Sequence, residues 1–147
     1  MDKLKIVKEV TELVTGKTVV LSGGFEQNET EIFGTGWMEI LHELSHWIVA
    51  TEEERLHPNL GFSKHENGMD CTDHNYRQEI RASELNHHLN MILGFDTKCE
   101  EDYDAYVREA KSRIPHKYSN KDIEYINDGL LERSDVKNIM KLILDKI

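Results

Sequence analysis

Cysteine, proline and long apolar runs are all scarce in this sequence. Its 147 residues include only two cysteines, Cys71 and Cys99, and these form no CxxC pair. No secretory signal peptide begins the chain, so we expect two reduced thiols in a cytoplasmic protein. The longest uninterrupted apolar run covers residues 47–50, whereas a membrane-spanning helix needs about 20 apolar residues. The sequence therefore predicts neither a disulfide framework nor a membrane protein.

Basic clusters are scarce as well. The chain has 18 Lys and Arg residues against 28 Asp and Glu residues, which gives a formal net charge of −10. Binding to a nucleic-acid backbone needs clustered cations that displace counterions, and here the cations are scattered, so we exclude a nucleic-acid partner. The acidic surface either favours a cationic substrate or simply keeps the protein soluble. The length fits a single domain spanning residues 1–147.

The hydrophobic periodicity predicts an α+β fold, a mostly helical single domain with a small β-sheet. The predicted helices cover residues 3–15, 37–52, 76–93, 100–113, 121–128 and 135–146. Gly16 offers a left-handed stop for the first helix. Two short segments rich in β-branched and apolar residues, 18–21 and 31–33, predict strands. Residues 57–75 lack periodicity, and a loop of this length often borders a functional site.

The strongest chemical signal is the HExxH sequence His42-Glu43-Leu44-Ser45-His46 inside a predicted helix. Side chains four residues apart lie on one helix face, so both imidazoles can reach one metal ion. Glu43 stands where zinc hydrolases keep a general base for metal-bound water. By composition, about 0.05 accidental HExxH patterns are expected in such a chain. The pattern therefore predicts a zincin-like helix whose His42 and His46 bind a divalent metal.

A catalytic metal needs a third protein ligand and an open coordination position. The metzincin spacing is absent, because no histidine follows His46 at the required distance. The downstream candidates are His57, His65, His74, Glu79, Glu84, His87 and His88. Glu79 lies near the start of the next predicted helix, and a carboxylate there would resemble the helix-borne third ligand of gluzincin-type sites. A fourth ligand such as His74 would instead close the coordination shell and favour a metal-stabilised binding module without catalysis.

The chain resembles the elongation factor P hydroxylase family, whose members hydroxylate a modified lysine of that translation factor. The resemblance runs in the same order and with similar spacing over residues 17–95, about half of the chain. The segments that carry it are KTVVLSGG (17–24), ILHELSHWIVA (40–50), LGF (60–62), NG (67–68) and EIRASEL (79–85). An HExxH sequence followed directly by Trp47 is more specific than HExxH alone. The chain would be a compact and divergent member.

The resemblance implies that His42, His46 and Glu79 are the metal ligands and that the metal is Fe(II). Two histidines and one carboxylate leave several positions open, which suits non-haem iron oxygenases that must bind O₂. The implied substrate is a protein with a modified lysine, such as elongation factor P. Glu43 would then relay protons or brace a neighbouring group.

The main alternative function uses the same residues. In a zinc metallopeptidase, His42, His46 and Glu79 would hold Zn²⁺, and Glu43 would act as the general base. Under either function we expect the metal between helix 37–52 and helix 76–93, with the loop 57–75 beside it.

Overall fold

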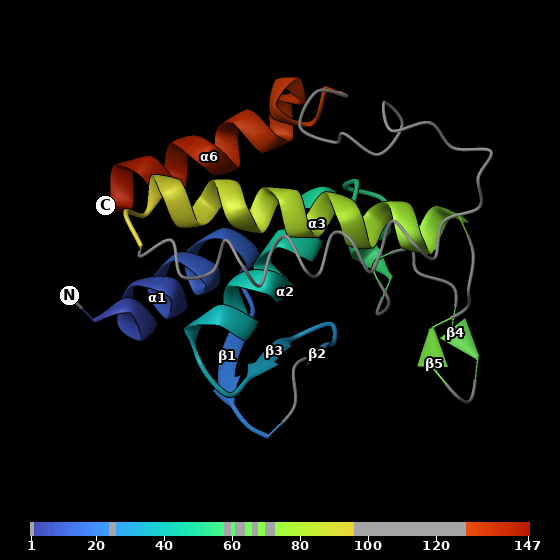
Figure 1. The fold of residues 1–147 in the computed structure, drawn as a ribbon, viewed down its shortest axis with the longest axis horizontal. Coiled ribbons are helices and arrows are strands. Elements are labelled where there is room, and N and C mark those ends of the chain that lie inside the picture. Colours follow the sequence, from blue (N-terminus) through green and yellow to red (C-terminus); the bar gives the residue numbers. More distant parts are fainter. Residues whose placement is uncertain are drawn as a thin grey trace.

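A helical body with a small sheet on one side makes up the fold, seen in a computed structural model of the chain (Figure 1). The structure describes residues 2–23, 26–57, 60, 64–65, 68–69, 73–95 and 129–147. Its helices are α1 (Lys3–Thr15), α2 (Trp37–Val49), α3 (Asp73–Ile92) and α6 (Ser134–Lys146), with the 3₁₀ turns η1 (Glu54–Leu56) and η3 (Leu130–Glu132). Its strands are β1 (Thr18–Leu21), β2 (Glu26–Gln27), β3 (Glu31–Gly34), β4 (Lys64–His65) and β5 (Gly68–Met69). The predicted fold class, a mostly helical α+β protein with a small sheet, is confirmed.

The three-stranded sheet has β3 in the middle, between β1 and β2. β1 runs parallel to β3 and pairs Val19 with Ile32, whereas β2 runs antiparallel and pairs Gln27 with Ile32. Val19 and Ile32 are buried, because alternate side chains of a strand point to opposite faces and this face is covered. β2 was not predicted, since its two residues are too few to show a period. It forms an edge of the sheet.

Helix α2 lies at the centre of the core, where it packs against α1, α3 and β3. Its residues Ile40, Leu41, Leu44 and Ile48 are at most 1% exposed. Burying side chains of this size stabilises a fold by about 1.5–3 kcal/mol each. The helix with the HExxH sequence is therefore held by packing on several sides.

Helix α1 begins and ends where the sequence predicts. The Asp2 carboxylate accepts a hydrogen bond from the Lys5 backbone N–H at 3.1 Å. Gly16 adopts a left-handed conformation, with φ of +70°, and donates its N–H to the Glu12 carbonyl. A residue without Cβ takes this conformation at little cost, so the predicted stop at Gly16 is confirmed.

In Figure 1 the three-stranded sheet lies below α2, and α6 lies above α3.

The segment 57–75 is less irregular than predicted. Among its described residues, β4 and β5 form a short antiparallel ribbon, and α3 already begins at Asp73. Strand pairing over two residues leaves no hydrophobic period, so the ribbon could not be predicted from the sequence. The helices predicted at 100–113 and 121–128 lie outside the described residues. Within the described ranges, no helix is long and apolar enough to cross a membrane.

Candidate metal centre

Three side chains that could hold a metal ion converge between α2 and α3. His42 and His46 lie one turn apart on α2, and Glu79 lies on α3, which packs against α2. The His46 Nε2 atom is 3.0 Å from the His42 Nε2 and 3.3 Å from the Glu79 Oε2. One donor atom from each residue lies within 4.8 Å of the other two. The structure thus brings the three predicted ligands together between the two predicted helices.

The three residues of this cluster influence one another's pKa values. Burial, with repulsion from His46, lowers the pKa of His42 to about 4, although Glu79 opposes the shift. Burial also lowers the pKa of His46, but the charge and hydrogen bond of Glu79, with the charge of Glu43, outweigh burial and raise this pKa overall. At neutral pH the His42 imidazole is therefore neutral, while Glu79 favours the form of His46 that carries a second ring proton. A divalent cation would displace this proton, since metal ligands bind in their deprotonated forms.

The remaining candidate ligands stay apart from the cluster. Among the residues that the structure describes, no further ligand joins the group of three; those outside it are His57, His74, Glu84, His87 and His88. The His74 Nε2 instead lies 3.4 Å from the Glu54 carboxylate at the η1 turn. His74 therefore gives no support to a closed, four-ligand shell. The side chain of His65 lies outside the described part of the chain.

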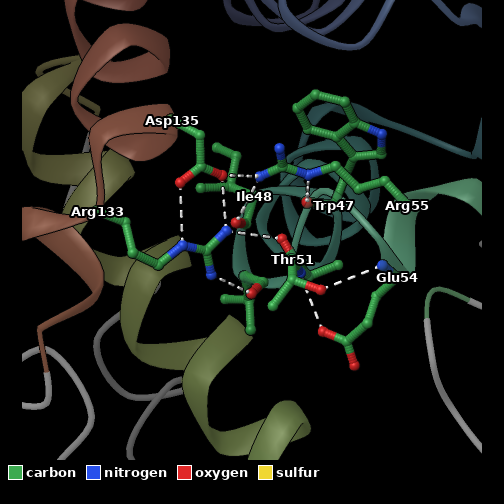
Figure 2. A network of polar contacts seen from close by, with 9 residues as sticks. Trp47, Ile48, Thr51, Glu54, Arg55, Arg133 and Asp135 are labelled. Carbon is green, nitrogen blue, oxygen red and sulfur yellow. Dashed lines mark hydrogen bonds and ion pairs between the residues drawn. The ribbon is translucent and has the colours of Figure 1, made fainter.

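Two arginines cap the C-terminal end of α2 (Figure 2). Arg55 donates from Nε to the Trp47 carbonyl at 2.8 Å and from Nη2 to the Ile48 carbonyl at 2.9 Å. Arg133 donates from its two terminal nitrogens to the next two carbonyls, those of Val49 and Ala50, at 2.9 Å each. The last carbonyls of a helix have no partner within the helix, so these two guanidinium groups satisfy four successive carbonyls.

Asp135 holds the two arginines in place between α2 and α6. Its carboxylate lies 2.7 Å from the Arg133 Nη2 and 3.1 Å from the Arg55 Nη2 (Figure 2). The Arg55 guanidinium also lies over the Trp47 ring, 4.1 Å from its centroid. His46 directly precedes the capped carbonyls, so this network fixes the end of α2 that carries a candidate ligand. This network could not be predicted from the sequence, because isolated charged residues form no recognisable motif.

Glu43 points to the sheet side of α2. The Gln27 Nε2 donates to the Glu43 Oε2 at 2.9 Å and to the Glu43 backbone carbonyl at 2.8 Å. The Lys17 Nζ in turn donates to the Gln27 Oε1 at 2.9 Å. Glu43 and Lys17 are each 8% exposed. The sequence predicts that Glu43 relays protons or braces a neighbouring group, whereas no sequence motif indicates Gln27 or Lys17.

The donor set of the cluster fits a catalytic metal. Two imidazoles and one carboxylate are the ligands of non-haem Fe(II) sites and also of many zinc hydrolases. The His46 and Glu79 side chains are 8% and 20% exposed, respectively, so the cluster is largely shielded from water. Comparisons with known protein families, with curated proteins and with solved structures find no match for this chain. The function of the protein is therefore inferred from the residues of the cluster and from the sequence resemblance.

Proposed function

We propose that this protein is a non-haem Fe(II) hydroxylase that modifies a lysine-type side chain of a protein, resembling the elongation factor P hydroxylases. The observation that carries the proposal is the convergence of His42, His46 and Glu79 from two helices, with donor atoms within 4.8 Å of one another. Three protein ligands leave open positions on an octahedral ion. The proposed substrate is a translation factor, so the proposal also places the protein in the cytoplasm.

The overall charge supports a cationic substrate. A net charge of −10 attracts a basic side chain and repels anionic ligands. Hydroxylation inserts one oxygen atom of O₂ into a C–H bond and reduces the other to water, with two electrons and two protons from a reductant. Iron supplies the O₂ chemistry when bound. His42, His46 and Glu79 would hold it, and the burial of the cluster would exclude bulk water from the reaction.

The test begins with protein purified anaerobically without a histidine tag, followed by metal analysis. The protein is then incubated with Fe(II), O₂, a reductant and elongation factor P that carries its modified lysine. We expect stoichiometric iron and a substrate that gains the mass of one oxygen atom. His42→Ala and His46→Ala should each abolish both results, because two remaining ligands hold a catalytic metal poorly.

A zinc metallopeptidase is the second candidate, and the position of Glu43 favours it over a non-enzymatic function. Glu43 follows the first ligand on α2 and contacts β2, an edge strand, and peptidases often bind an extended substrate along a sheet edge. A peptide-cleavage assay with Zn²⁺ is therefore run on the same preparations.

Glu43→Gln separates the chemistry from metal binding. The variant should keep the metal, and in either enzyme it should lose activity, by about 10²–10⁴-fold if Glu43 transfers a proton. Oxygen addition that requires Fe(II) and O₂ would establish the hydroxylase. Cleavage that persists without O₂ in the presence of Zn²⁺, and disappears in Glu43→Gln, would instead establish the peptidase.

A further inference from the structure

The side chain of Gln27 connects a buried lysine to the glutamate of the HExxH sequence. It accepts a hydrogen bond from the Lys17 Nζ and donates two to Glu43, one to the carboxylate and one to the backbone carbonyl. These residues come from three different places: the turn before β1, the edge strand β2 and helix α2. The chain of contacts runs along the side of α2 that faces the sheet.

Lys17 determines which way the Gln27 amide faces. An ammonium group can only donate hydrogen bonds, so the amide oxygen must face Lys17 and the NH₂ group must face Glu43. Lys17 is 8% exposed, and turning the amide round would leave a buried cation facing a donor, which is costly. The Glu43 carboxylate therefore meets a fixed donor.

Glu43 stands close to the candidate ligands without belonging to their group. It directly follows His42, and its negative charge contributes to raising the pKa of His46. Yet its carboxylate oxygens are not among the donor atoms that lie within 4.8 Å of one another. The directions of the His42 and Glu43 side chains differ by about 100° around the helix axis. A rotation of the Glu43 side chain is needed to bring its carboxylate to the cluster.

We infer that Gln27 is a positioning residue that holds the Glu43 carboxylate away from the metal, so that the metal keeps its open coordination positions. Lys17 supports this by fixing the Gln27 amide. The inference rests on the metal site of the proposed function, but it holds for iron and zinc alike. Without Gln27, the Glu43 carboxylate would bind the metal as a fourth protein ligand and occupy a position that water or substrate needs.

The competing explanation is purely structural, in which Gln27 only ties β2 to α2. Both explanations predict a less stable protein when Gln27 is replaced, so stability cannot separate them. They differ in the number of water molecules that the bound metal holds. Mn²⁺ favours octahedral geometry, so three protein ligands leave about three positions for water, and a fourth ligand leaves about two.

The experiment measures the proton relaxation rate of water in the presence of Mn²⁺ bound to the full-length protein. The variants are Gln27→Leu, which removes the donor without adding charge, and Gln27→Glu, which keeps a partner for Lys17 if the first variant does not fold. Each is also combined with Glu43→Gln. Glu26→Gln, in the same strand and exposed, is the matched control.

We expect Gln27→Leu and Gln27→Glu to lower the relaxivity of bound Mn²⁺ by about a third, as one of three waters is lost. Adding Glu43→Gln should restore the wild-type value, and the Glu26→Gln control should keep it. Unchanged relaxivity in the Gln27 variants would overturn the inference, as would a decrease that persists with Glu43→Gln. A wild-type protein that binds no Mn²⁺ would also overturn it.

The two proposals can fail separately. If the relaxivity follows the expected pattern but no hydroxylated product forms, the proposed function is wrong and the positioning role of Gln27 stands. If the wild-type enzyme hydroxylates its substrate but the relaxivity does not respond to Gln27, only the inference is wrong.

Discussion

Replacing Arg133 with alanine should destabilise the protein measurably, because this side chain joins the start of α6 to the end of α2. The variant loses the hydrogen bonds to the Val49 and Ala50 carbonyls and one of the two arginine partners of Asp135. A hydrogen bond from a charged donor contributes about 1.5–3 kcal/mol when buried. The Arg133 side chain is 28% exposed, so in the variant water can replace part of each lost hydrogen bond.

The expected loss is therefore about 2 kcal/mol in the free energy of unfolding, or about 1 kcal/mol for each carbonyl. For a protein of this size, that corresponds to a decrease in Tm of roughly 4–8 °C. Urea titration and thermal unfolding, both followed by circular dichroism, measure the two quantities. Arg133→Lys keeps the charge near the helix C-terminus but lacks the planar fork, so it should recover less than half of the loss.

The control is an ion pair that joins α6 to α1 at the surface. The Lys146 Nζ lies 3.6 Å from the Glu9 Oε2, and both side chains are more than 40% exposed. Exposed pairs of this kind contribute between about 0 and 1 kcal/mol, so Lys146→Ala should have a much smaller effect. If Arg133→Ala lowers the free energy of unfolding no more than Lys146→Ala does, the Arg133 guanidinium does not hold the end of α2.

Glu79→Ala should abolish stoichiometric metal binding while Glu84→Ala retains it, since only Glu79 belongs to the cluster. Equilibrium dialysis with Fe(II) or Zn²⁺ measures the binding, and the opposite result would mean that the register of α3 is wrong. The hydrogen bond from Arg133, together with the positive charges of Arg133 and Arg55, lowers the pKa of Asp135, although burial opposes the shift. The ionised Asp135 should therefore stabilise the protein at neutral pH, and this stabilisation should decrease as the pH falls below about 4. The stability difference between the wild type and Asp135→Asn should shrink over that range, and a difference independent of pH would contradict the assignment. Gly34→Ala should lower the Tm, because the new Cβ would lie 2.9 Å from the Ile40 Cγ1; an unchanged Tm would show that Ile40 moves aside freely.

The sequence alone determined the features that depend on neighbours along the chain. Apolar residues at helical spacing predicted the helices now seen as α1, α2, α3 and α6, with bounds that agree to within a few residues. The stop at Gly16 followed from local backbone chemistry. The proximity of His42 and His46 is also local, because residues four apart on a helix share a face.

The third member of the cluster required tertiary structure. Glu79 lies on another helix, and several other downstream residues were chemically able to act as the third ligand. The resemblance pointed to Glu79, and the packing of α2 against α3 places its carboxylate beside His46. That the three residues meet is an observation; that they bind a metal stays a prediction.

Only the tertiary structure showed the polar contacts that surround the cluster. Gln27 meets Glu43 because β2 pairs with β3, and a strand of two residues leaves no period to detect. Arg133 reaches the Val49 carbonyl across 84 positions of sequence. Helical periodicity and capping depend on residues within about one turn of each other, whereas these hydrogen bonds form only once packing has brought distant segments together.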